Sequence, residues 1–146
     1  MSQRLNFYGA SPEAIKALSA LEGAVNKLGL EPALLELVKL RASQINGCAF
    51  CVDMHSSDAR KAGETERRLH SVSVWRETPF FTERERAALG WTEALTQLSL
   101  THAPDADYDA LKAQFNDKEM VDLTLAISTI NAWNRFAVGF RKMPAA

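Results

Sequence analysis

CAFCVDMH, residues 48–55, contains the only two cysteines of the chain, three positions apart, and a histidine four positions after the second. The flanking sequence has helical character, and residues three, four and seven apart lie on one face of a helix. Cys48, Cys51 and His55 therefore form one stripe. Two helical residues three apart also have Cα atoms near the ~5.5–6 Å separation that a disulfide prefers. The stretch predicts a helix that carries a redox-active dithiol beside an imidazole.

Apolar residues recur at helical spacing along the rest of the chain, and period-two alternation is never sustained. Proline at a first helical position and acidic capping residues give the start signals, as in the capping box of Thr82 and Glu85. We predict an all-α fold of about six to seven helices in a single domain, residues 1–146. The expected helices cover 12–28, 32–45, 48–62, 64–74, 82–98, 108–115 and 116–140, with a loop at 99–107.

The composition is that of an ordinary globular domain. Of 146 residues, 47% are apolar, and 17 basic against 18 acidic residues give a net charge of −1. No basic block indicates a nucleic-acid partner, and no apolar run approaches the ~20 residues of a membrane helix. The N-terminal residues lack the apolar run of a secretory signal. We therefore expect a cytoplasmic protein without a nucleic-acid or membrane partner.

A cysteine pair in such a chain indicates redox catalysis or metal binding. The reactive form of cysteine is the thiolate, which a helix N-terminus favours at Cys48. His55 lies one turn beyond Cys51 and is placed to take its proton. Glu36, on the preceding helix, could orient His55 or act as a base. The alternative for Glu36 is a solvated carboxylate paired with Lys39 or Arg41.

The spacing of Glu36, Cys48, Cys51 and His55 resembles the E-x11-C-x2-C-x3-H signature of AhpD-like alkylhydroperoxidases, members of the carboxymuconolactone decarboxylase superfamily. Surrounding words also match: LRASQINGC at 40–48, DMH at 53–55, VWRE at 74–77 and INAWNR at 130–135. The resemblance extends from about residue 10 to residue 142. It implies an AhpD-like helical bundle with a thiol peroxidase site.

The resemblance also implies a role for each site residue. Peroxide would attack Cys51, and Cys48 would then condense with the sulfenic acid to form a disulfide. Glu36 and His55 would form the proton relay. No cofactor or metal is expected to be bound, but an external dithiol, either a lipoyl protein or a thioredoxin-like protein, would reduce the disulfide. Those relatives carry a histidine between the cysteines, whereas this chain has Ala49 and Phe50, so its local relay lacks one imidazole.

Other functions use the same residues. A disulfide reductase or a redox-signalling protein would need only the dithiol. A metal-binding helical module is a weaker alternative, because structural zinc usually takes four protein ligands and no second pair exists. A decarboxylase or isomerase like the namesake of the superfamily would not need the cysteine pair. In a non-enzymatic assembly protein the pair would be incidental.

The predicted helices carry more apolar surface than one small bundle readily buries. The last helix is apolar on several sides, and the 64–81 segment adds Val72, Val74, Trp75, Phe80 and Phe81. We therefore expect a homo-oligomer, and the resemblance points to a trimer or a hexamer, of which we favour the hexamer.

Overall fold

The computed structural model describes residues 1–146 and contains helices but no strands. The helices are α1 (Phe7–Ala10), α2 (Pro12–Val25), α3 (Pro32–Ile45), α4 (Ala49–Lys61), α5 (Glu66–Ser71), the 3₁₀ helix η1 (Val72–Glu77), α6 (Glu83–Thr96), α7 (Leu98–Thr101), α8 (Asp105–Gln114) and α9 (Asp117–Gly139). The all-α prediction is confirmed, and the seven longer α-helices correspond to those expected from the sequence.

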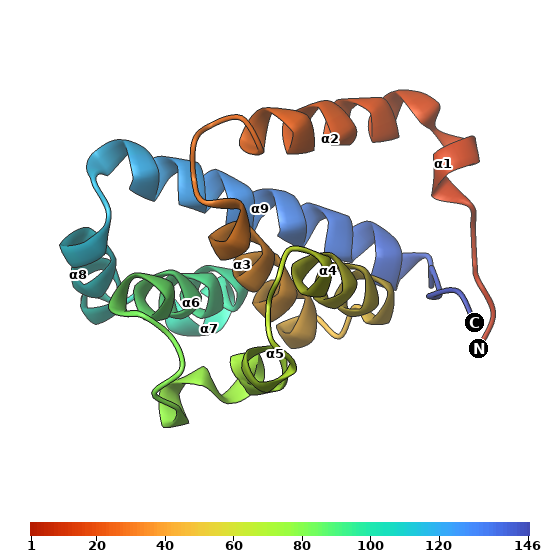
Figure 1. Cartoon of the computed structure of the whole chain (residues 1–146). Coiled ribbons are helices and arrows are strands. Elements are labelled where there is room, and N and C mark those ends of the chain that lie inside the picture. The colour runs from red at the N-terminus through yellow and green to blue at the C-terminus, as the bar shows by residue number, and fades with distance from the viewer.

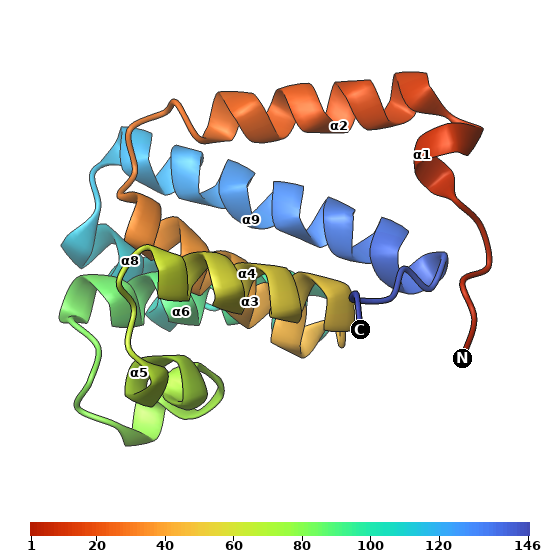
Figure 2. The same cartoon turned by 45° about the vertical axis from the view of Figure 1, so that its right-hand side comes forward.

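Helix α9 runs through the middle of the bundle (Figures 1 and 2). It packs against α2 on one side and against α3, α4 and α6 on the other. The chain ends meet at one end of the molecule, where the backbone N–H of Arg4 donates to the carbonyl of Phe140 at 2.9 Å. None of the helices is both long enough and apolar enough to span a lipid bilayer.

Local signals set the helix starts. Pro12 and Pro32 occupy first helical positions in α2 and α3. Complete capping boxes begin α6, at Thr82 and Glu85, and α9, at Asn116. Each box satisfies N–H groups that the first turn of a helix leaves unpaired.

Two clusters of buried apolar side chains hold the helices together. The larger lies among α2, α3, α6, α8 and α9 and includes Val38, Ala88, Leu111, Leu123 and Ile127. The smaller joins α3 and α4 to α5, η1 and α6, and includes Leu37, Leu40, Val72, Trp75 and Leu89. Helix α3 contributes to both clusters, so the helix that carries Glu36 is a rigid part of the core.

Glu93 on α6 connects the two sides of the smaller cluster. Its carboxylate accepts from Trp75 Nε1 at 2.6 Å, Arg41 Nε at 3.1 Å and Arg76 Nη2 at 3.1 Å. Burial acts to raise the pKa of Glu93, but the Trp75 hydrogen bond and the arginine charges outweigh it, so this pKa is lowered. Glu93 therefore stays ionised and holds η1 against α3 and α6.

The short helices were not predicted correctly. Helix α1 was missed because it is one turn long and depends on Phe7 packing against Phe136, with ring centroids 5.5 Å apart. Helix α7 occupies the start of the expected 99–107 loop, and α8 begins at Asp105 rather than 108. The α-helical part of the expected 64–74 helix is only Glu66–Ser71, and the chain continues as η1, within which Val74 has non-helical dihedral angles.

Candidate active site

Cys48 and Cys51 are joined by a disulfide at the N-terminus of α4. Their Cα atoms are 5.3 Å apart, within the range expected from their spacing. Cys48 is the N-cap residue rather than a residue of the first turn, and its Sγ accepts from the Cys51 backbone N–H at 3.3 Å. Both cysteines are buried and pack against Ala137 of α9. The pair can therefore exist as a disulfide without rearrangement of the helix.

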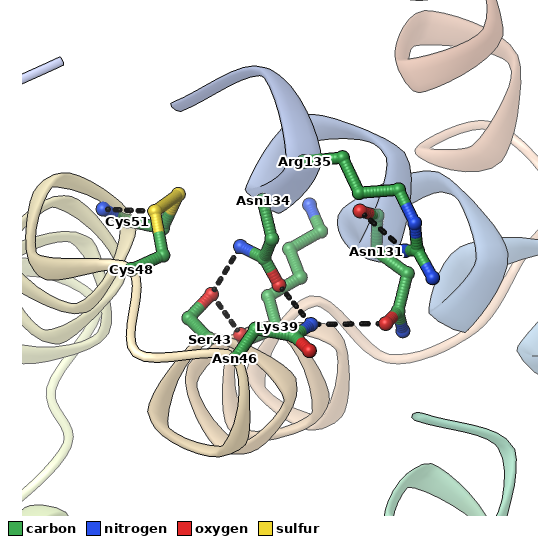
Figure 3. Close-up of a disulfide and its surroundings, with 8 residues drawn as sticks. All are labelled: Lys39, Ser43, Asn46, Cys48, Cys51, Asn131, Asn134 and Arg135. Atoms are coloured by element: carbon green, nitrogen blue, oxygen red, sulfur yellow. Dashed lines mark hydrogen bonds between the residues drawn. A yellow bond between two sulfur atoms is a disulfide. The ribbon is translucent and has the colours of Figure 1, made fainter. Parts of the chain in front are cut away.

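The turn from α3 to α4 is anchored to α9 by buried amides (Figure 3). Asn46 Nδ2 donates to the side-chain oxygens of both Asn131 and Asn134, at 2.9 Å each. Asn134 Nδ2 in turn donates to Ser43 Oγ at 3.0 Å. Gly47 completes the turn with a φ of +65°, a conformation that glycine adopts without strain. This network fixes the start of α4, and with it the cysteines.

Glu36 and His55 meet across the α3–α4 contact, with His55 Nδ1 and Glu36 Oε2 3.0 Å apart. The side chains are 20% and 8% exposed, so the pair is largely shielded from water. The alternative pairing of Glu36 with Lys39 or Arg41 is wrong, because Lys39 pairs with Glu22 and Arg41 with Glu93. The carboxylate can fix the orientation and tautomer of the imidazole. The catalytic role of each residue stays a prediction.

A cavity of about 370 Å³ connects these groups; we call it the Cys51 cavity. Its lining includes Cys51, Glu36 and His55 together with the aromatic residues Phe7, Tyr8, Phe50 and Trp133, and the charged residues Glu22, Lys39, Asp58 and Lys142. The volume lies in the range of small-molecule sites. A reactant of organic size can therefore reach the cysteine that is predicted to be attacked.

Cys48 does not line the Cys51 cavity. It lines a second one of about 350 Å³, the Cys48 cavity, with Arg4, Arg141 and Lys142 as its charged side chains. Ala137 and Lys142 line both cavities. The two halves of the disulfide thus line two different, neighbouring cavities.

Carboxylate and imidazole groups also gather in the Cys51 cavity in an arrangement that could hold a cation. The ligand atoms of Glu36, His55 and Asp58 lie within 4.8 Å of one another. Neither cysteine belongs to this group, so it differs from the zinc site considered from the sequence, which used both thiolates.

Lys142, Phe7 and Tyr8 were missed from the sequence. They lie near opposite ends of the chain, and no local pattern relates residues 135 positions apart. Only the contact of α1 with the end of α9 brings them to the cavity (Figure 1).

The sequence profile of the carboxymuconolactone decarboxylase family matches residues 12–94, which include the complete Glu36, Cys48, Cys51 and His55 set. The chain belongs to the carboxymuconolactone decarboxylase family. Within it, the chain is 39% identical over 146 residues to the uncharacterized protein YdfG of Bacillus subtilis, covering 100% of this chain and 99% of YdfG. The uncharacterized protein YnjA of Escherichia coli is 34% identical over 107 residues, covering 73% of this chain and 58% of YnjA.

Solved structures give the same family placement. A crystal structure from Agrobacterium tumefaciens, of a protein of unknown function proposed to be the antioxidant defence protein AhpD, superposes with a TM-score of 0.97. The two chains are 52% identical, and 99% of each is covered. The debrominase Bmp8 shares the fold at 19% identity, with a TM-score of 0.85 over 94% of this chain and 74% of its own. The AhpD-like fold is therefore confirmed.

Proposed function

We propose that this protein is a thiol-dependent peroxidase that reduces peroxides through the Cys48–Cys51 dithiol. The observation that carries the proposal is the convergence of Cys51, His55 and Glu36 on one cavity, with the imidazole and carboxylate 3.0 Å apart. A thiol nucleophile beside an oriented base is the arrangement that activates cysteine. The likeness to a protein proposed to be AhpD supports the same function.

The reaction begins with the reduced pair. His55 takes the proton of the Cys51 thiol, and the thiolate attacks the outer oxygen of the hydroperoxide, R–O–OH. The O–O bond breaks, Cys51 becomes a sulfenic acid, and the alkoxide leaves as the alcohol R–OH with the proton that His55 held. Cys48 then attacks the sulfenic sulfur, so that water leaves and the disulfide forms.

An external dithiol must return the two electrons, since the chain has no other thiol. A lipoyl protein or a thioredoxin-like protein fits this role. The charged side chains of the Cys48 cavity, Arg4, Arg141 and Lys142, are all basic. This charge favours a reductant whose surface is acidic around its reactive thiol.

The decisive experiment measures peroxide consumption by the reduced protein with dihydrolipoamide, thioredoxin or glutathione as reductant. The wild type should turn over with a dithiol, and Cys51→Ser should lose the reaction. Cys48→Ser should stop at the sulfenic acid, which dimedone traps on Cys51 as a mass adduct. If the wild type consumes no peroxide yet exchanges its disulfide with thiols, the function is that of a disulfide reductase or redox signal.

We also expect this protein to form a homo-oligomer, although its own core buries much of the apolar surface that suggested one. Leu123, Ile127 and Ile130 of α9 are buried within the chain, as are Val72 and Trp75. Exposed apolar side chains remain on α7, α8 and α9, including Val121, which is 69% exposed. They flank a groove lined by Trp91, Tyr108, Met120, Val121 and Leu125, and such patches favour self-association.

A further inference from the structure

Lys142 lies just beyond α9, with its side chain directed toward three aromatic rings. Its Nζ is 4.2 Å from the ring centroid of Tyr8, 4.5 Å from that of Phe50 and 5.8 Å from that of Phe7. All three rings line the Cys51 cavity, and none lines the Cys48 cavity. The ammonium group therefore belongs to the wall of the cavity that contains the predicted attacked cysteine.

Each of the other acidic and basic side chains of this wall contacts a partner, which is an oppositely charged group or, for Glu36, a ring nitrogen of His55. Lys39 Nζ and Glu22 Oε1 are 2.7 Å apart, and Glu36 contacts His55. Asp58 pairs with Lys61 at 4.0 Å. Lys61 is the only one of these partners that does not line the cavity. Lys142, in contrast, has neither an acidic group within 4.0 Å nor a side-chain hydrogen bond.

A cation in this position is poised to bind an anion. Contact with the faces of aromatic rings stabilises an ammonium group and limits its motion, but it supplies no hydrogen-bond acceptor of ordinary strength. The N–H donors of Lys142 therefore remain open to a carboxylate, which forms charge-assisted hydrogen bonds. Because the rings hold the ammonium in place, binding costs less side-chain entropy than it would at a free surface lysine.

The volume of the Cys51 cavity indicates the size of the rest of the ligand. At about 30 Å³ for a water-sized group, a cavity of about 370 Å³ has room for roughly twelve such groups. Hydrogen peroxide has two heavy atoms and would leave most of this space unfilled. The rings of Phe7, Phe50 and Trp133 offer apolar surface to a hydrocarbon or aryl body.

We propose that Lys142 binds the carboxylate of an organic hydroperoxide whose apolar body fills the Cys51 cavity. The preferred substrate class is thus a hydroperoxide of a medium-sized carboxylic acid rather than hydrogen peroxide or a neutral alkyl hydroperoxide. This substrate assignment rests on the proposed peroxidase function, but the anion site itself does not, because a carboxylate without a peroxide group should bind there too.

The first test uses calorimetric binding of octanoate and of octanamide, a neutral molecule with the same number of heavy atoms, to the disulfide form. Octanoate should bind at least about tenfold more tightly, the effect of one charge-assisted hydrogen bond. Lys142→Met should remove this preference, and Lys142→Arg should keep it because the charge remains. Lys112→Met, which changes an exposed lysine on α8 outside both cavities, should behave as the wild type.

Equal binding of the two ligands by the wild type, or an octanoate preference that survives in a folded Lys142→Met protein, would overturn the assignment. The second test compares a fatty-acid hydroperoxide with its methyl ester in the peroxidase assay. Lys142→Met should lower the preference for the acid over the ester, measured as the ratio of their kcat/KM values, at least about tenfold, because any effect of Lys142 on the reductant is common to both substrates. If octanoate binds through Lys142 but no peroxide is consumed, the anion site stands while the substrate assignment fails together with the proposed function.

Discussion

Replacement of Glu36 by glutamine tests whether the carboxylate next to His55 sets the reactivity of Cys51. The change keeps the size of the side chain and can keep a hydrogen bond to His55 Nδ1, which is 3.0 Å from Glu36 Oε2. It removes the negative charge that stabilises the imidazole once it has taken the proton of Cys51. The fold should survive, because Glu36 is outside both clusters of the core.

The magnitude follows from the kind of hydrogen bond that is lost. A hydrogen bond to a charged group contributes about 1.5–3 kcal/mol and a neutral one about 0.5–1.5 kcal/mol, so the substitution should cost about 1–2 kcal/mol. At about 1.4 kcal/mol for each factor of ten, oxidation of Cys51 should slow roughly 5–30-fold. His55→Ala removes the base itself and should slow oxidation by about 10²–10⁴-fold.

The assay is a single turnover of the fully reduced protein with excess cumene hydroperoxide at pH 7, stopped by alkylation and read by mass spectrometry as loss of two hydrogens. Glu22→Gln is the matched control, since Glu22 lines the same cavity but pairs with Lys39 instead of His55. Equal rates for wild type and Glu36→Gln, or an equal loss in Glu22→Gln, would refute the argument that the Glu36–His55 contact activates the thiol.

Three further outcomes are expected elsewhere in the molecule. Glu93→Gln should lower the free energy of unfolding at pH 7. The difference in this free energy between wild type and variant should shrink below about pH 4, because a group with a lowered folded-state pKa stabilises the fold only while it is ionised. Denaturant titrations at both pH values measure this difference. Asn134→Ala should cost about 1–3 kcal/mol by the same method, since it removes one hydrogen bond from Asn46 and one from buried Ser43. Light scattering at micromolar concentration should give a mass several times the 16.2 kDa of one chain, and a monomer would contradict the oligomer prediction.

The Glu36–His55 contact shows which part of the site a local sequence pattern predicts and which part it leaves open. The spacing of Cys48, Cys51 and His55 sets their common face because helix geometry depends only on neighbours along the chain. That Glu36 belongs with them came from resemblance to a known signature, and from the turn at Gly47 that folds α3 back on α4. From the sequence, Lys39 and Arg41 were also possible partners of Glu36. The structure excludes both, because each forms a salt bridge with a different carboxylate.

The sequence by itself determined the all-α class, the limits of most long helices and the dithiol stripe, because capping, helical periodicity and i, i+3 spacing are local properties. Tertiary structure alone decided that Cys51 and Cys48 line different cavities, that Ile127 is buried while Val121 is exposed, and that Lys142 meets Tyr8. Each of these depends on contacts between residues far apart in the chain. Such contacts are fixed by how whole helices pack, and amino-acid spacing along one helix carries no information about them.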